Sequence, residues 1–156
     1  MSLGIVVGIA ALGAAGGAAL PTAAYRLSVP WREPGQPPVP PRDTCRYCQA
    51  ALPSGVPGWL RLGSRCAHCR RRLGPPGWLL GGVAALACAG LAVRFGPSPL
   101  LVPYLLVALL GVLIAAVDLT AQRIPDALIL PGAVATVVLF AGVAGITGEP
   151  FSSVPW

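Results

Sequence analysis

Four cysteines form two Cys-x2-Cys pairs, Cys45 with Cys48 and Cys66 with Cys69, and seventeen residues separate the pairs. This spacing is typical of a tetrahedral zinc site with four thiolate ligands. Because four protein ligands leave no open coordination position, we expect a structural zinc ion rather than one that activates water. Metal binding on the order of 10 kcal/mol would then stabilise a loop that has no core of its own.

Disulfide bonds are the alternative to a metal, and they require the loop to face an oxidising compartment. His68 lies between two of the cysteines, and we expect it to be a bystander because four thiolates already complete the coordination shell. The fifth cysteine, Cys88, lies within an apolar stretch, where we expect a small buried apolar residue.

Carboxylates could also do chemistry, and the chain has only five: Glu33, Asp43, Asp118, Asp126 and Glu149. The simplest interpretation of Asp118 is an interfacial residue at the end of an apolar stretch, and that of Asp126 is a helix cap after a proline. The alternative for Asp118 is catalysis. Two carboxylates held close together cannot both ionise easily, so one stays protonated while the other activates water for attack on a peptide carbonyl.

The composition is that of a membrane protein, with 55% hydrophobic residues, 10% charged residues and a mean hydropathy of +0.74. Four apolar stretches approach the length needed to cross a bilayer core of about 30 Å, namely 3–20, 78–93, 100–117 and 127–147. We therefore expect an all-α polytopic membrane protein with four transmembrane helices. The expected parts are helix 1–20, a metal-binding loop 21–77, three helices within 78–147 and an outer tail 148–156.

Positive charge is concentrated in that loop. Residues 26–72 hold nine of the eleven Arg and two of the five carboxylate residues. Because short Arg-rich loops resist translocation, we expect this loop to be cytoplasmic in the plasma (inner) membrane. The N-terminus, 94–99 and Glu149 are then outside, and 118–126 is inside. The flanking spans favour contacts with anionic lipid over nucleic-acid binding. The first stretch lacks a basic region before it, so we expect a helix rather than a cleaved signal peptide.

Glycine and proline mark how these helices are joined and packed. The Gly-x3-Gly spacings Gly4/Gly8, Gly13/Gly17 and Gly77/Gly81 place small residues on one helix face and allow a neighbouring helix to approach closely. Residues 30–41 contain six Pro and are expected to form an extended spacer. The Gly and Pro residues of 94–99 predict a tight antiparallel hairpin, and 118–125 predicts a turn at the opposite side.

Three segments together resemble type IV prepilin peptidases. Asp118-Leu-Thr-Ala-Gln-Arg-Ile-Pro-Asp126 resembles the segment that carries the first catalytic aspartate of that family. Tyr25-Arg26-Leu27 is similar to the signature after its first helix, and 45–73 resembles its cytoplasmic zinc loop. The resemblance implies that Asp118 is one of two aspartates that cleave leader peptides from prepilin or pseudopilin precursors at the inner membrane face.

The chain also departs from this family. The second catalytic aspartate of the family lies in a Gly-x-Gly-Asp motif beyond the fourth helix, and this sequence has no such motif. We therefore expect an N-terminal portion of a longer enzyme, or else an inactive relative that acts as a membrane scaffold. A zinc-ribbon binding protein unrelated to pili is a third hypothesis. Some family members also transfer methyl groups from S-adenosylmethionine, but the acid that follows their zinc loop has no counterpart in 74–80.

Overall fold

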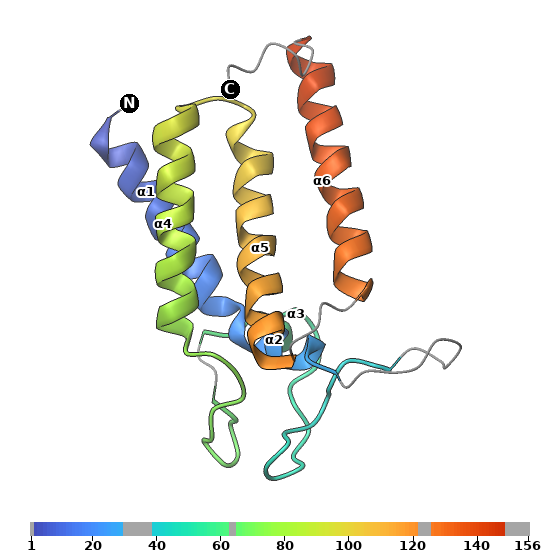
Figure 1. The fold of residues 1–156 in the computed structure, drawn as a ribbon. Coiled ribbons are helices and arrows are strands. Elements are labelled where there is room, and N and C mark those ends of the chain that lie inside the picture. Colours follow the sequence, from blue (N-terminus) through green and yellow to red (C-terminus); the bar gives the residue numbers. More distant parts are fainter. Residues whose placement is uncertain (1, 30–38, 63–64, 122–125, 149–156) are drawn as a thin grey trace.

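The chain folds into helices that run side by side, as Figure 1 shows. The computed structural model describes residues 2–29, 39–62, 65–121 and 126–148. The helices are α1 (Leu3–Ala19), α2 (Pro21–Leu27), α3 (Val56–Trp59), α4 (Gly77–Phe95), α5 (Leu101–Ala121) and α6 (Asp126–Thr147). Within the described residues the only β-type pairings are two isolated bridges, so the expectation of an all-α fold is confirmed.

Three of these helices, α4, α5 and α6, are long and apolar enough to cross a membrane. The bent pair of α1 and α2 would make a fourth span if it is counted as one, and the bend between them is 41°. Each of the four expected stretches coincides with a helix to within a few residues. The sequence therefore predicts the long helices well.

Two helix boundaries differ from the expectation. Residues 21–27, which we assigned to the loop, form α2, because Pro21 occupies the first helical position, where its missing N–H costs nothing. We assigned Asp118 to the connection between two helices, but it lies in the last helical turn of α5. The helix continues past it because no Gly or Pro follows until Pro125. The hydroxyl of Thr120 donates back to the carbonyls of Ala116 and Val117 and continues the helix there.

Glycines bring α1 and α4 into close contact. A Cβ atom added at Gly17 would lie 2.5 Å from the carbonyl oxygen of Leu80, and one added at Gly81 would lie 2.9 Å from that of Ala14. The expected close approach therefore occurs through 13–17 and 77–81. A Cβ at Gly8 would meet nothing within 4 Å, so the first Gly-x3-Gly spacing plays no part in it. Cys88 is buried against Gly13 in the same contact, as expected.

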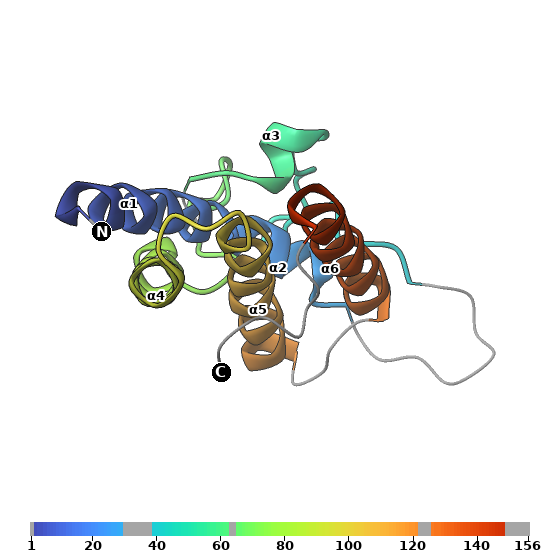
Figure 2. The ribbon, with the colours of Figure 1, turned by 90° about the horizontal axis from the view of Figure 1, so that it is seen from above.

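A second layer of packing joins α2 and α4 to α5. The apolar core consists of Ala23, Ala24, Leu80, Ala84, Val112, Leu113, Ala116 and Val117. Two alanines of the short helix α2 thus pack directly against the last third of α5. Near the start of α5, the ring of Tyr104 stacks on Phe95 at the end of α4 at 4.4 Å and meets Phe140 of α6 edge-on at 5.0 Å. Figure 2 shows α5 between α4 and α6.

The two ends of the helix bundle differ. The start of α1, the connection 96–100 and the end of α6 lie at one end in Figure 1. The opposite end carries 42–53 and 65–73, which contain the four paired cysteines and which we call the cysteine module. The last turn of α5, which contains Asp118, lies at this module end in Figure 1, as the alternation of spans predicts. Most of the proline spacer (30–38), the turn 122–125 and the tail 149–156 lie outside the described residues.

The contact between α1 and α4 leads to a first prediction. Gly17→Ala should lower stability by about 1–3 kcal/mol, because the new methyl group must displace the backbone of α4. Thermal unfolding in detergent micelles measures the change. Gly8→Ala on the same helix is the matched control and should leave stability equal or slightly higher. Equal stability of the two variants would contradict the proposed packing.

Candidate metal centre

Each cysteine pair lies in a tight turn of the same design. In the first turn, the amide of Cys45 donates to the carbonyl of Ala50 and the amide of Gln49 donates back to the carbonyl of Cys45, both at 2.9 Å. The same two bonds recur in the second turn, between Cys66 and Arg71 and between Arg70 and Cys66. A single antiparallel bridge flanks each turn. The chain therefore presents two equivalent knuckles that face one another.

Both knuckles contain a residue with an unfavourable backbone conformation. Gln49 and Arg70, each directly after the second cysteine of its pair, have φ of 57°. For residues other than Gly, this left-handed conformation costs about 1–2 kcal/mol each. The amides of these two residues donate to Cys45 and Cys66, so the turn bonds require the conformation. The turns that position the cysteines thus hold Gln49 and Arg70 in a conformation that these residues do not prefer.

The four paired cysteines bring their sulfur atoms together in one compact group. Sγ of Cys45 lies 3.7 Å from Sγ of Cys69, and Sγ of Cys48 lies 3.8 Å from Sγ of Cys66. All four sulfurs lie within 4.8 Å of one another. A zinc ion with bonds of about 2.3 Å to four tetrahedral thiolates needs sulfur separations of about 3.8 Å. The ligand set therefore fits zinc.

The same distances exclude disulfides in this structure. All five cysteines are free thiols, whereas a disulfide would bring two sulfurs to about 2.05 Å. His68 is exposed and lies outside the four-sulfur group, in agreement with its expected role as a bystander. The thiolates alone can complete the coordination shell.

Backbone amides prepare one thiolate in each knuckle. Burial raises the pKa of Cys45, but the N–H groups of Cys48 and Tyr47 and the neighbouring thiols outweigh it and lower the pKa from 9.0 to about 6. The N–H groups of Cys69 and His68 lower the pKa of Cys66 in the same way.

The partner thiol in the first knuckle behaves differently. The N–H of Ala50 acts to lower the pKa of Cys48, but burial and the adjacent thiols of Cys69 and Cys45 prevail and raise it to about 11. Like charges so close together cannot all form without a cation. A divalent ion would supply that cation and displace the remaining protons.

Tyr25 of α2 docks the cysteine module onto the helices. Its hydroxyl donates to the carbonyl of Thr44 at 3.0 Å and accepts from the amide of Arg46 at 2.8 Å. Its ring is buried in a small core with Cys45, Cys66 and Leu73. A side chain of the membrane-associated part thus completes the core that surrounds the ligands.

Arg26 makes the second attachment. Its Nη2 donates to the carbonyl of Pro53 at 2.6 Å, and its guanidinium lies 5.1 Å from the centre of the Trp59 ring. The side chain is only 5% exposed, and its Nε has no hydrogen-bond partner within the described residues. Sequence reasoning identified Tyr25 and Arg26 only through a resemblance and missed their structural role. A Tyr-Arg pair directly after an apolar helix is the signal that could have indicated an anchor.

Asp118, the predicted catalytic residue, is exposed in the last turn of α5. Two residues further on, Oγ1 of Thr120 lies 2.7 Å from Oγ of Ser28, which follows α2. The structure therefore brings 25–27, the cysteine module and the end of α5 together at one end of the bundle. Asp126 begins α6, but its side chain lies outside the described part of the chain, so its distance from Asp118 is not described.

No protein-family model, curated protein or solved structure matches this chain. The likeness to prepilin peptidases therefore depends on the three sequence segments alone.

The ligand set predicts a specific pattern of metal content. The unaltered protein should contain one tightly bound zinc ion per chain, and Cys45→Ser should lose it because a hydroxyl is a poor ligand for zinc. Elemental analysis of the purified protein measures the content. Cys88→Ser is the control, since Cys88 lies in α4 away from the cluster, and it should keep the metal. Loss of metal in both variants, or in neither, would contradict the assignment.

Tyr25→Phe tests the docking contact. The variant keeps the ring but removes both hydrogen bonds, leaving the carbonyl of Thr44 and the amide of Arg46 without this partner. We expect a loss of about 1–3 kcal/mol, measured as faster metal release to a chelator and a lower unfolding temperature. Tyr104→Phe is the control, because the contacts of Tyr104 with Phe95 and Phe140 are made by its ring, which the variant keeps. Equal metal release from the two variants would show that the hydroxyl of Tyr25 does not stabilise the module.

Proposed function

We propose that this protein is an aspartic endopeptidase of the prepilin peptidase type, built around a structural zinc site. One observation carries the proposal: three segments far apart in the sequence meet at one end of the helix bundle. These segments are 25–27, the cysteine module and the end of α5 with its exposed Asp118. Their meeting at one end favours a common function over three unrelated likenesses.

Zinc is the metal that best fits the cysteine module. The donor set is all thiolate, and the sulfur separations of 3.7 and 3.8 Å suit its tetrahedral radius. Bound there, the ion supplies structural cross-linking and no Lewis acid for the reaction, because the four cysteines fill its coordination shell. The knuckles then stay closed around Tyr25 and keep 25–27 against α5.

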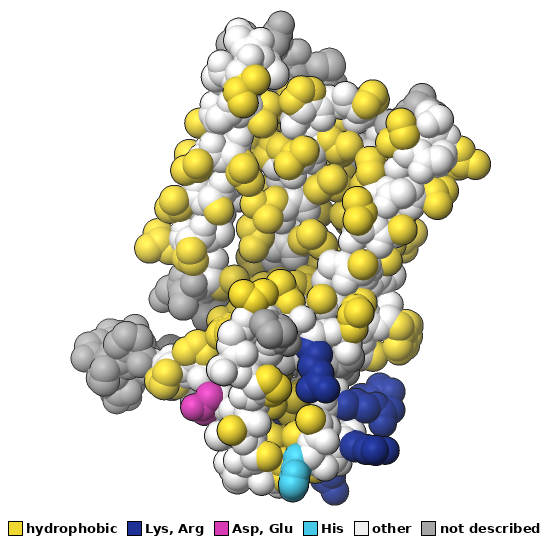
Figure 3. Space-filling view, turned by 180° about the vertical axis from the view of Figure 1, so that it is seen from behind, with side chains coloured by type: hydrophobic (Ala, Val, Ile, Leu, Met, Phe, Trp, Pro, Cys, Tyr) yellow, Lys and Arg dark blue, Asp and Glu magenta, His cyan; other side chains and the backbone are white. Residues whose placement is uncertain are grey.

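The module end faces the cytoplasm in this proposal. Figure 3 shows Arg side chains gathered on the module, while hydrophobic side chains cover the helices above it. Short Arg-rich segments resist export, so this end remains inside and the start of α1 is outside. A substrate whose apolar segment lies in the lipid would present its leader junction at the level of Asp118.

Asp118 acts in the proposed reaction as one of two carboxylates. One carboxylate stays protonated and the other takes a proton from water as it attacks the scissile carbonyl. Asp118 suits this task because it is exposed to water at the end of an apolar helix. We assign the second carboxylate to no residue of this chain. Methyl transfer from S-adenosylmethionine is not included, because 74–80 contains no acid.

A non-catalytic membrane scaffold is the second candidate function. The observation that favours it is that none of the five carboxylate residues in this sequence lies in a Gly-x-Gly-Asp motif. Such a scaffold would bind pilin-like precursors through the same end of the bundle without cutting them. A zinc-ribbon binding protein unrelated to pili would need the cysteines but not Asp118.

Asp118→Asn separates these functions. The enzyme that contains this chain together with the second carboxylate, reconstituted in lipid with a prepilin-like precursor, should release the leader peptide, and its Asp118→Asn variant should do so at least about 100-fold more slowly. Mass spectrometry of the precursor measures cleavage. Asp43→Asn is the matched control, because Asp43 is an exposed carboxylate of the cysteine module, and its variant should cut normally. Undiminished cleavage by Asp118→Asn, or none by the unaltered protein, would contradict the peptidase assignment.

A further inference from the structure

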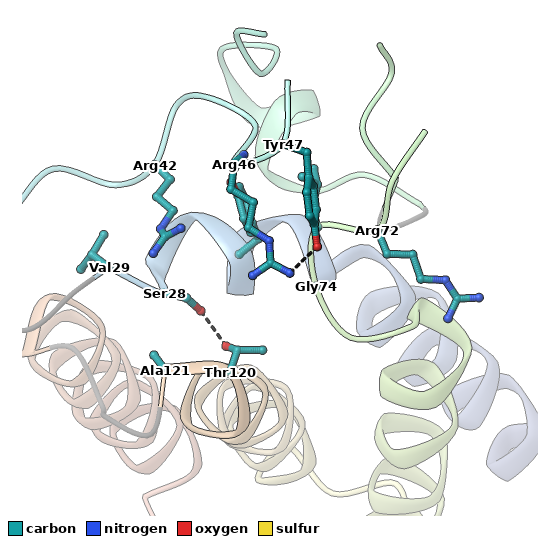
Figure 4. A pocket seen from close by; sticks show the side chains of 11 residues that line it. Ser28, Val29, Arg42, Arg46, Tyr47, Arg72, Gly74, Thr120 and Ala121 are labelled. Carbon is teal, nitrogen blue, oxygen red and sulfur yellow. Dashed lines mark hydrogen bonds between the residues drawn. The ribbon is translucent and has the colours of Figure 1, made fainter. Parts of the chain in front are cut away.

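A polar pocket lies where the cysteine module meets the ends of α2 and α5. Its volume is about 560 Å³, within the range of small-ligand sites. Figure 4 shows its walls: one side comes from the module, and the other comes from the residues that follow α2 and end α5. The lining residues are Tyr25, Ser28, Val29, Arg42, Arg46, Tyr47, Arg72, Leu73, Gly74, Thr120 and Ala121.

This pocket is positively charged. Three of its described lining residues are Arg, and none of the described ones is acidic. Arg42 and Arg46 extend toward Ser28 and Thr120 in Figure 4. Within the described part of the chain, no carboxylate pairs with either of these two guanidinium groups. Both guanidinium groups thus carry charge that no described carboxylate neutralises.

Aromatic rings support both guanidinium groups without neutralising them. The guanidinium of Arg42 lies 5.7 Å from the centre of the Tyr25 ring, and that of Arg46 lies 4.8 Å from the centre of the Tyr47 ring. Nη2 of Arg46 also donates to the hydroxyl of Tyr47 at 2.7 Å. Such contacts restrict the side chains, and among the described residues they leave other N–H donors of each guanidinium unused.

The backbone at both positions is anchored to α2. The amide of Arg42 donates to the carbonyl of Arg26 at 2.9 Å, and the amide of Arg46 donates to the hydroxyl of Tyr25. On the opposite wall, the 2.7 Å contact between Ser28 and Thr120 joins α2 to α5. Hydrogen bonds thus hold the backbone of Arg42 and Arg46 in place, opposite the hydrogen-bonded side chains of Ser28 and Thr120. A ligand would not have to pay for ordering the loop that carries them.

We propose that this pocket binds a phosphate group. Guanidinium groups recognise phosphate oxygens with paired, charge-assisted hydrogen bonds, and two of them converge here. The pocket adjoins the end of α5, a helix apolar enough to cross a membrane, which is the level of lipid phosphates. The phosphate belongs either to the headgroup of an anionic lipid or to a small phosphorylated solute. The proposal is independent of peptidase activity.

The test compares two double variants that remove equal charge. Arg42→Gln with Arg46→Gln alters the pocket, while Arg61→Gln with Arg65→Gln alters exposed Arg residues elsewhere on the same loop. The full chain is placed in nanodiscs of phosphatidylcholine, alone or mixed with phosphatidylglycerol. Native mass spectrometry measures retained phosphatidylglycerol, and titration calorimetry measures binding of inorganic phosphate. Metal content confirms that each variant is folded.

Two results support the site and identify the source of the phosphate. Retention of phosphatidylglycerol that falls about tenfold in the pocket variant, but not in the control, indicates a lipid headgroup. Binding of inorganic phosphate in pure phosphatidylcholine with the same dependence indicates a soluble ligand. The proposal is overturned if the unaltered protein binds neither probe, or if both double variants weaken binding equally, because diffuse surface charge would then explain the effect.

A second pair of variants leaves every Arg in place. Ala121→Glu introduces a carboxylate at the pocket wall that can pair with the guanidinium groups and should weaken binding at least about fivefold. Leu119→Glu introduces the same charge on an exposed position of the same helix turn and should have little effect. Equal binding by these two variants would count against the pocket as the site.

Discussion

The docking of the cysteine module onto α2 through Tyr25 is the interaction on which the arrangement of the module end of the bundle depends. One buried side chain contributes a ring to the core around the ligands and a hydroxyl to the first knuckle. Neighbouring alanines of the same short helix pack against α5. The four-cysteine group is therefore connected by direct contacts through a seven-residue helix to the end of the helix that carries Asp118. The phosphate pocket is formed by the same docking.

The position of α2 depends in turn on glycine. The close contact of α1 with α4 requires Gly17 and Gly81, since a methyl group at either would strike the opposite backbone. The 41° bend after α1 then turns α2 so that it reaches α5. Gly74, just after the second knuckle, passes so near α2 that an added Cβ would lie 2.9 Å from the carbonyl of Pro21. Small residues thus determine where the module and the helices meet.

Much of this architecture could be predicted from the sequence because the signals are local. Apolar length indicated the long helices, and cysteine spacing indicated the four-thiolate cluster. The role of Tyr25 could not be predicted, because it depends on bonds to residues about twenty positions away. The same holds for the pocket between Arg46 and Thr120, which come from distant segments. The catalytic role of Asp118 stays a prediction, since the described part of the chain identifies no second carboxylate beside it.

Amide hydrogen exchange in α2, compared between metal-loaded and metal-stripped protein, tests the central claim most directly. If the cluster and Tyr25 stabilise α2, removing the metal should speed exchange throughout 21–27 and the cysteine module. The middle of α4 and α5 should stay protected, because their packing does not involve the cluster. Unchanged protection of 21–27 after complete metal removal would contradict the account, since α2 would then be ordered without the module.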